Sequence, residues 1–298
     1  MLRINKKSHS IYKYKGLLGL LPALLFMLFF FIGGTLQSIY ISLSNDTTNF
    51  ENKSSLSAYK ELINITFIHS LGITTGIAAV TAIVSGTIGL FVAVYLAARS
   101  YKWKWLTVLF QLPMGIPHLL AAYLLMQVLM QSGWYARIAY HLGLIHSFEK
   151  FPILVNDNWS IGILLAYMWK EVPFIIMLIF PFASKLLLEW DETSKSLGAS
   201  FKQTILLVIL PILMPLWVGG MWVIFAFALG AYEIPAIMGR TALGSVPVLA
   251  WQEYTQFGLD RQPVAIAMNL ALAVISFLVG ALLIYLQVKW YNRGRRVW

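Results

Sequence analysis

Between two long apolar runs stands the polar, glycine-containing segment Asp191-Glu192-Thr193-Ser194-Lys195-Ser196-Leu197-Gly198-Ala199-Ser200. The apolar run after it reaches Val208-Ile209-Leu210-Pro211. A helix needs about 20 apolar residues to cross the hydrocarbon core of a bilayer. The polar segment is therefore expected to lie in water at one face of a membrane, where another protein can contact it.

Six apolar runs have this length, which predicts an all-α, polytopic membrane protein with six transmembrane helices. The composition agrees, because 59% of the residues are hydrophobic and only 11% are charged, against roughly 45–50% apolar residues in soluble domains. The absence of cysteine excludes disulfides, thiolate metal sites and cysteine nucleophiles. The predicted spans are 17–43, 68–98, 106–130, 161–188, 205–229 and 264–288.

The excess of basic residues predicts the orientation of the chain. Lys and Arg accumulate in the cytoplasmic loops of membrane proteins. Placing both termini in the cytoplasm puts 15 Lys and Arg residues in cytoplasmic segments and 6 in external ones. We therefore expect a multi-pass protein of the cell membrane, with both termini and the segment after residue 190 in the cytoplasm. The net charge of +10 gives no reason to expect a nucleic-acid partner.

Small residues and prolines recur within the spans. Gly72 and Gly76 begin a series of small residues that suits close helix packing, either inside one bundle or at a subunit interface. Prolines remove backbone donors and tend to kink helices, although they are common in membrane helices in any case. They lie in the third, fourth and fifth spans, as Pro113, Pro117, Pro173, Pro181, Pro211 and Pro215.

The segment between the fourth and fifth spans predicts a helix, a sharp turn and a second helix. Asp191 and Glu192 suit the first turn of a short helix, where the helix dipole favours negative charge. Gly198 suits the end of that helix, because glycine adopts the left-handed conformation at little cost. Ser200 and Gln203 form a capping box for the next helix. Apolar contact surface is expected from Leu197, Ala199 and Phe201.

This spacing resembles the signature of binding-protein-dependent ABC importer permeases with a type I, MetI-like transmembrane domain. The matching residues are Glu192-Thr193-Ser194, Gly198, Val208 and Leu210-Pro211, with Thr193 and Ser194 in place of the usual alanines. The resemblance implies that residues 67–298 are the transmembrane core of five helices, with a coupling helix at about 189–203. Residues 1–66 would supply the cytoplasmic N-terminus, the first transmembrane helix and an outer loop.

In that family the coupling helix docks on a separate ATPase. The resemblance assigns this role to Asp191, Glu192, Ser194, Leu197, Gly198, Ala199 and Phe201, although a charged loop with no function beyond topology is an alternative. It implies two ATPase subunits, a second permease subunit of a different chain and an extracytoplasmic solute-binding protein as partners in the lipid bilayer. The chain has no Walker phosphate-binding sequence. ATP and Mg²⁺ are thus expected in the partner ATPase, and this chain is expected to have no cofactor and no enzymatic activity.

Ionisable residues within the fourth span are candidates for the substrate path. Charged side chains at the bilayer centre are costly and usually face a cavity or a partner. Glu171 is expected to line the path or its gate, while Lys170 finds another partner, since adjacent residues point to different sides of a helix. A structural role for both is the alternative. Tyr232 and Glu233, after the fifth span, are further path candidates.

The segments 230–239, 248–254 and 263–265 look similar to the polyamine and ferric-iron branch of these permeases. The expected function is ATP-driven import of a polyamine such as spermidine or putrescine, with ferric iron, thiamine or phosphonate as alternatives. Ala231 occupies the position where that branch commonly has an acid. An intramembrane enzyme would need a convergent catalytic group, and a secondary transporter or channel would show inverted repeats or pore charges. Neither is visible, and His141 and His146 do not have the spacing of a metal site.

Overall fold

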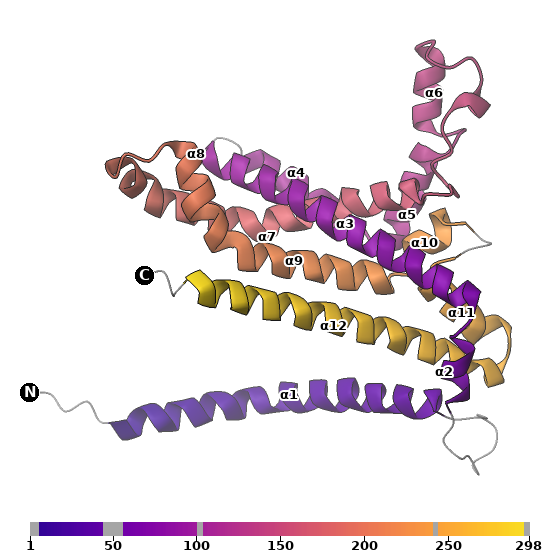
Figure 1. Ribbon diagram of the computed structural model, residues 1–298, viewed down its shortest axis with the longest axis horizontal. Helices are drawn as coiled ribbons and strands as arrows, with labels where there is room; N and C mark the ends of the chain where they lie inside the picture. The colour runs from indigo at the N-terminus through magenta and orange to yellow at the C-terminus, as the bar shows by residue number, and fades with distance from the viewer. Residues whose placement is uncertain (1–5, 44–55, 100–103, 241–243, 295–298) are drawn as a thin grey trace, which may run out of the picture.

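The computed structural model describes residues 6–43, 56–99, 104–240 and 244–294. Within these ranges all regular structure is helical, which confirms the predicted all-α class. Figure 1 shows long helices lying roughly side by side, with short helices gathered at one end. Arg3, Lys53, Lys102, Arg295 and Arg296, which entered the orientation prediction, lie outside the described residues.

Four long helices make up most of the bundle: α3 (Ile65–Ala98), α7 (Ile161–Ser196), α9 (Leu210–Gly230) and α12 (Gln262–Gly294). The long helix α1 (Lys6–Ser42) precedes them. The shorter helices are α2 (Ser57–Glu61), α4 (Lys104–Gly115), α5 (His118–Leu129), α6 (Trp134–His141), α8 (Phe201–Thr204), α10 (Glu233–Met238) and α11 (Val246–Gln256). Two 3₁₀ turns (Phe148–Lys150 and Leu259–Arg261) and a π-helical turn (Ile205–Ile209) complete the described elements.

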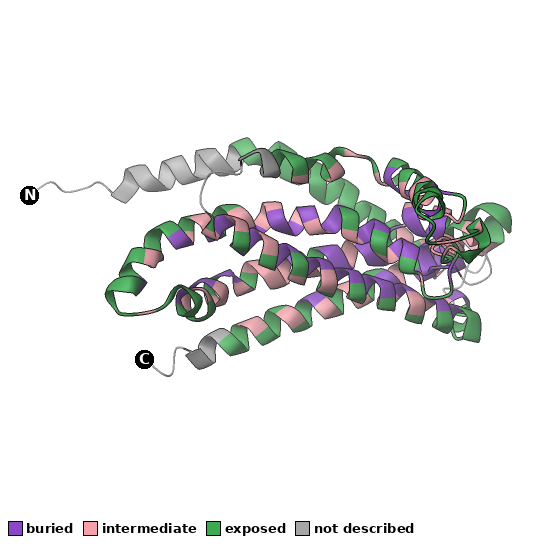
Figure 2. Ribbon diagram, turned by 90° about the horizontal axis from the view of Figure 1, so that it is seen from above, coloured by how far each residue is buried: buried purple, intermediate pink, exposed green. Residues whose placement is uncertain are grey.

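The core lies where α3 packs against α7 and α9. Figure 2 shows buried residues along these inner helices and exposed residues on the helices around them. The small residues of α3 explain the close packing, because a Cβ on Gly86 would collide with Met221 and one on Gly89 with Ile175. Gly72 and Gly76, in contrast, have no neighbouring atom within 4 Å of an added Cβ. Part of the small-residue series therefore packs inside the bundle.

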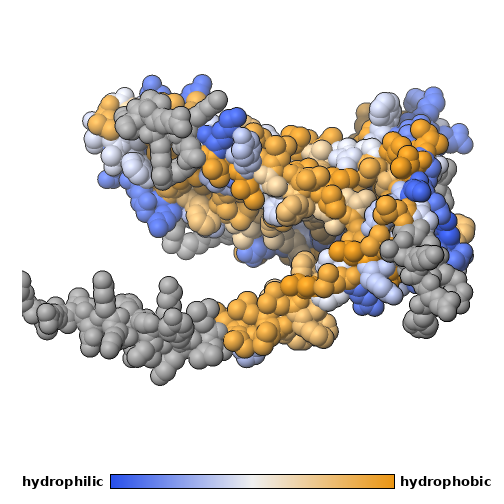
Figure 3. Space-filling model, turned by 60° about the horizontal axis from the view of Figure 1, so that its bottom comes forward, coloured by the Kyte–Doolittle hydropathy of each residue, from blue (hydrophilic) through white to orange (hydrophobic). Residues whose placement is uncertain are grey.

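Among the described residues, five helical stretches are long and apolar enough to cross a membrane, and a bent pair raises the number to six if it is one span. The single stretches are Gly19–Ser42, Ile65–Ala98, Ile161–Ser196, Phe201–Gly230 and Leu259–Trp290. Figure 3 shows hydrophobic surface over the middle of the bundle and hydrophilic surface toward its ends. This distribution is the one expected of a bundle surrounded by lipid.

The third predicted span is broken rather than continuous. The stretches Val108–Gly115 and His118–His141 meet at an angle of 103°. Pro117 lies at the break and has no N–H with which to continue the helical hydrogen bonding. Pro173 and Pro181, in contrast, lie inside the continuous helix α7. The sequence predicted a kink near Pro117, but it gave no indication of the bend angle.

Helix α1 stands apart from the core. No residue from 19 to 41 is buried, and α1 packs against α12. Its end is held by the buried Ser42, whose hydroxyl forms a 2.8 Å hydrogen bond with that of Tyr59 in α2. The first predicted span is therefore attached to the bundle mainly at one end.

Candidate functional site

The candidate coupling segment forms an elbow, which we define as residues 191–203, at one end of the bundle beside α8 in Figure 1. Helix α7 continues without interruption to Ser196, so Asp191 and Glu192 lie near its C-terminal end. The prediction that they open a separate short helix is wrong, because no helix breaker separates residue 188 from residue 191. Asp191 is instead paired with Lys195 one turn later, with Oδ2 and Nζ 2.7 Å apart. This pair offsets an acidic charge that the dipole disfavours there.

The turn of the elbow is a Schellman motif centred on Gly198. Gly198 has a φ of +80°. Its N–H donates to the Lys195 carbonyl at 2.9 Å, and the Ala199 N–H donates to the Ser194 carbonyl at 3.0 Å. These two bonds satisfy carbonyls that the end of α7 would otherwise leave unpaired. The prediction that the helix ends at this glycine is confirmed.

Helix α8 begins with the predicted capping box. The Ser200 side chain accepts from the Gln203 N–H, and the Gln203 side chain accepts from the Ser200 N–H. The π-helical turn follows directly and ends two residues before Pro211. Proline cannot donate to an earlier carbonyl, which favours irregular helical hydrogen bonding just before it. The capping box thus holds the turn that leads from the elbow into the fifth span.

The elbow presents apolar and acidic side chains to its surroundings. Leu197 is 84% exposed and Leu188, just before the elbow, is 81% exposed. Glu192 and Phe201 are exposed as well, whereas Ser194 is buried and Ala199 is half-buried. These side chains leave apolar surface at the elbow that a partner can cover. The geometry therefore suits docking of another polypeptide.

Lys170 lies inside the bundle and binds the break in the third span. It is 4% exposed. Its Nζ donates to the Pro113 carbonyl at 3.1 Å and also to the Ile116 carbonyl. In a continuous helix the Pro113 carbonyl would accept from residue 117, which is a proline without an N–H. The buried ammonium replaces that missing donor and also meets the negative end of the α4 dipole.

Glu171, the next residue of α7, is buried as well, and aromatic groups gather near the start of α5. Glu171 is 8% exposed. The rings of His118 and Tyr167 both pack on Phe227, with centroids 4.6 and 6.4 Å away. Tyr167 is fully buried, and its hydroxyl has no hydrogen-bond partner within the described part of the chain. Aromatic and ionisable groups from α5, α7 and α9 therefore meet at membrane depth.

Tyr232 and Glu233 follow α9, and their side chains lie in different surroundings. Glu233 is half-buried in the first turn of α10, which packs against α5, and it lies within electrostatic range of His118. The ring of Tyr232 packs instead on Trp251 of α11, with centroids 5.5 Å apart. Of the predicted path residues, Lys170 contacts the break in the third span, Glu171 is buried next to it in α7, and Glu233 lies on α10, which packs against α5.

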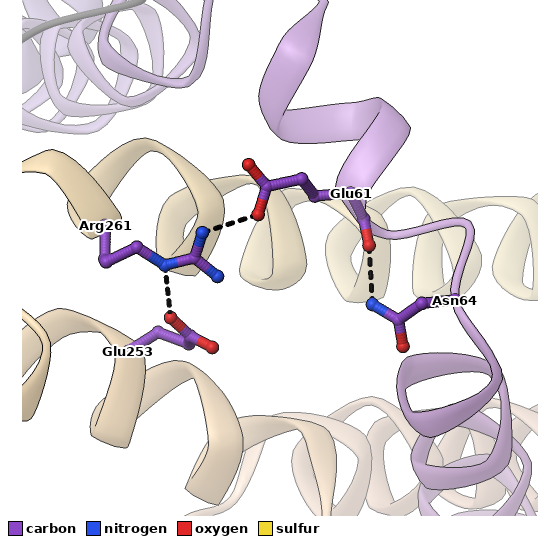
Figure 4. Close-up of polar contacts among 4 residues, drawn as sticks. All are labelled: Glu61, Asn64, Glu253 and Arg261. Atoms are coloured by element: carbon purple, nitrogen blue, oxygen red, sulfur yellow. Dashed lines mark hydrogen bonds and ion pairs between the residues drawn. The ribbon is translucent and has the colours of Figure 1, made fainter.

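Two polar groupings at the other end of the bundle were not singled out from the sequence. One is a three-residue ion-pair cluster centred on Arg261, drawn in Figure 4. Its Nη1 lies 2.5 Å from a Glu61 carboxylate oxygen and its Nε 2.8 Å from a Glu253 carboxylate oxygen. The cluster joins α2 and α11 to the 3₁₀ turn Leu259–Arg261 that precedes α12. No sequence signal pairs residues 200 positions apart.

The other grouping lines a cavity of about 190 Å³. It contains charged and polar side chains from four separate segments, among them His69, Asp157, Arg240 and Ser245. The polar run 156–160 just before the fourth span was the available sequence signal. It gave no indication of which segments would join it.

Comparison with known proteins gives a family match over most of the chain. Residues 85–296 match the family described as binding-protein-dependent transport system inner membrane component. A probable sulfate transport system permease protein cysT from Nephroselmis olivacea is 24% identical, over 88% of this chain and 89% of that protein. The sulfate transport system permease protein CysT of Escherichia coli K12 is 26% identical, over 74% of this chain and 75% of that protein.

Two solved structures share the fold. A chain of a bacterial ABC transporter involved in the import of the acidic polysaccharide alginate superposes with a TM-score of 0.73, at 15% identity, covering 95% of this chain and 99% of that one. A chain of the MetNI methionine ABC transporter gives a TM-score of 0.51 at 14% identity, covering 76% of this chain and 99% of that one. At these identities the likeness supports the fold alone.

Proposed function

Because the chain belongs to the family of binding-protein-dependent transport system inner membrane components, we propose that its elbow couples it to a separate ATPase that drives solute import. The chain is a multi-pass permease component and not itself an enzyme. In the proposed assembly it pairs with a second permease subunit and receives solute from an extracytoplasmic binding protein. Two ATPase subunits bind ATP and Mg²⁺ on the side of the elbow, which is the cytoplasmic side.

The observation that carries this proposal is the construction of the elbow. Leu197 projects from a turn whose backbone is fixed by the Schellman motif on one side and a capping box on the other. A rigid turn with an exposed leucine binds a partner without a large ordering cost. The elbow is also covalently continuous with α7 and α9, which pack against α3 in the core. Motion imposed on the elbow is therefore transmitted directly to the membrane helices.

For the solute we propose a tetrahedral oxyanion of the sulfate class. The relatives described above are sulfate permeases. The polyamine and ferric-iron branch expected from residues 230–239 finds no support among them, and neither do thiamine or phosphonate.

The coupling proposal is tested with Glu192→Lys in the complex purified from cells that express the complete transporter. We expect an ATPase subunit to copurify with the unaltered chain, and we expect the variant to insert normally but to lose ATP-dependent uptake in proteoliposomes. The matched control is Glu149→Lys, which makes the same charge change at the opposite end of the bundle. Full transport by Glu192→Lys, or equal loss in both variants, would contradict docking at the elbow.

The solute is tested in the same proteoliposomes, loaded with the binding protein. Uptake of radiolabelled sulfate is compared with uptake of radiolabelled spermidine at equal concentration. ATP-dependent uptake of sulfate alone is expected. Uptake of spermidine would refute the oxyanion assignment while leaving the coupling proposal intact.

A further inference from the structure

Helix α6 and the segment after it form an arm, which we define as residues 131–151, that projects from the bundle. Figure 1 shows α6 lying crosswise to the long helices, at the end of the bundle where α2, α10 and α11 gather. Its main contacts are with α5 and with the 3₁₀ turn Phe148–Lys150. The run His118–His141, which ends with α6, departs from the direction of α4 by 103°. Because the long helices cross the membrane, α6 runs close to the membrane plane.

The length of the long helices places the arm at the level of the lipid headgroups. Helix α3 has 34 residues, which corresponds to about 50 Å at 1.5 Å per residue. The hydrocarbon core of a bilayer is about 30 Å thick, and the bilayer with its headgroups is about 40–45 Å thick. The ends of α3 therefore reach the headgroup region. Helix α6 lies at one of these ends and extends sideways from it (Figure 1).

Contacts within the arm hold its shape. The side-chain amide of Gln131 donates to the Glu149 carbonyl at 3.1 Å and to the Phe151 carbonyl at 2.9 Å. The ring of Tyr140 packs on that of Phe148, with centroids 5.3 Å apart. These contacts join α6 to the segment that returns toward α7. The arm therefore presents its outer surface at little ordering cost.

One side of α6 is an aromatic face, which we define as Trp134, Tyr135 and Ile138. Each of these side chains is at least half exposed. They fall within a sector of about 100° around the helix, because an α-helix has 3.6 residues per turn. Ala136, on another side of α6, is fully buried. Tryptophan and tyrosine are enriched where a membrane meets water, since their rings are apolar and their N–H and O–H groups are polar.

A cation lies beside the aromatic face. Arg137 is exposed and has no ion-pair partner within the described part of the chain. Its Nε donates to the Ser132 carbonyl at 3.1 Å. Glu149 and Lys150, on the return segment, are adjacent and opposite in charge. The arm therefore has a net positive charge with neutral histidines, which suits the phosphate groups of lipids. Helices that lie in the membrane interface combine an apolar aromatic side with basic residues in this way.

The direction of the arm separates a lipid partner from a protein that docks at the end of the bundle. A protein that docks there from water would meet groups that extend along the long axis of the bundle. The arm extends across this axis instead (Figure 1). Exposed apolar surface is costly in water, whereas lipid beside the bundle covers it. The geometry and the charge therefore both favour the bilayer as the partner.

We infer that the arm is an interfacial anchor that binds the surface of the phospholipid bilayer in the leaflet away from the elbow. The aromatic face lies at the boundary between headgroups and acyl chains, and Arg137 lies near the phosphates. Helix α5 leads directly into the arm, whereas α4 packs on α7. The anchor therefore holds the part of the third span after the break at Pro117 to the membrane surface.

The test measures the depth of the arm in a bilayer. The chain has no cysteine, so Ile138→Cys provides a single site for a nitroxide spin label. The full-length chain, with the partner chains that copurify with it, is reconstituted in vesicles of phosphatidylcholine and phosphatidylglycerol in equal parts. Electron paramagnetic resonance then compares collisions of the label with oxygen, which concentrates in lipid, and with a nickel chelate, which stays in water.

We expect oxygen collisions to dominate at Ile138→Cys, with the label about 5–10 Å inside the interface. Tyr135→Cys repeats the measurement at a second position of the aromatic face and should give the same result. The control is Lys60→Cys, an exposed position of α2 at the same end of the bundle. There nickel collisions should dominate, and the ratio of oxygen to nickel collisions should be severalfold lower.

Two results of the collision measurement would overturn the inference. If the nickel chelate reaches Ile138→Cys as readily as Lys60→Cys, the arm lies in water. If both reagents collide rarely with the label at Ile138→Cys, a protein such as a second permease subunit covers the aromatic face.

A charge placed on the aromatic face provides a second measurement. Trp134→Glu, combined with Ile138→Cys, should move the label toward water and lower the ratio of oxygen to nickel collisions severalfold. The matched control is Trp159→Glu, which makes the same change at an exposed tryptophan outside the arm. Equal ratios in the two variants would overturn the inference. None of these outcomes depends on the solute or on ATP, so they leave the transport experiments to be judged separately.

Discussion

Replacing Gly198 with alanine tests whether the elbow must hold its shape to work. An alanine Cβ at this position would have no atom within 4 Å, so the change introduces no steric collision with neighbours. The cost comes from the backbone, whose φ of +80° is left-handed. For an L-residue this conformation costs roughly 1–2 kcal/mol. Such an energy changes the ratio of the formed to the opened elbow by a factor of about 5–30.

Amide hydrogen exchange measures this ratio directly. The Gly198 and Ala199 amides close the Schellman motif, so both should exchange faster in Gly198→Ala by about that same factor. ATP-dependent uptake should fall as well. The control is Gly72→Ala, which also places a Cβ in open space but in the interior of α3. It should stabilise the chain by roughly 0.5–1 kcal/mol. Unchanged exchange at the elbow in Gly198→Ala would refute the assigned strain.

Three further substitutions test the polar groups inside and at the end of the bundle. Lys170→Met removes the buried donor to two backbone carbonyls and should lower the free energy of unfolding in mixed detergent by about 2–3 kcal/mol; unchanged stability would contradict the bridging role. Glu171→Gln should slow uptake while the protein stays folded, and unchanged uptake and solute-stimulated ATPase activity would remove this residue from the path. Arg261→Gln breaks two partly exposed ion pairs and should cost about 1 kcal/mol, less at high salt; a salt-independent loss would argue against an electrostatic cause.

The parts of the fold that were predictable depend on neighbouring residues. The turn at Gly198 and the capping box of Ser200 and Gln203 each involve residues a few positions apart, so their chemistry can be recognised in the sequence. The long apolar runs likewise determine where helices form. The prediction of a separate helix that begins at Asp191 was wrong, because α7 passes through residue 190 without interruption.

The features that sequence reasoning missed are assembled from distant segments. The bend at Pro117 depends on Lys170, more than 50 positions later, to satisfy the carbonyls that the break exposes. The cavity around Ser245 combines four segments, and the cluster around Arg261 combines three. Lys170 and Pro117 stood out in the sequence, but nothing there indicated that they would meet. Only the packing of the helices brings the charges together.

The isolation of helix α1 has a practical consequence for engineering the chain. Residues 19–41 contribute nothing to the buried interior, so the length and apolar character of this segment matter more than its individual side chains. It can therefore be exchanged for another hydrophobic anchor, or extended at its start with a fluorescent reporter, without repacking the interior. Such fusions make it possible to measure the amount of protein in living cells without changing the rest of the sequence.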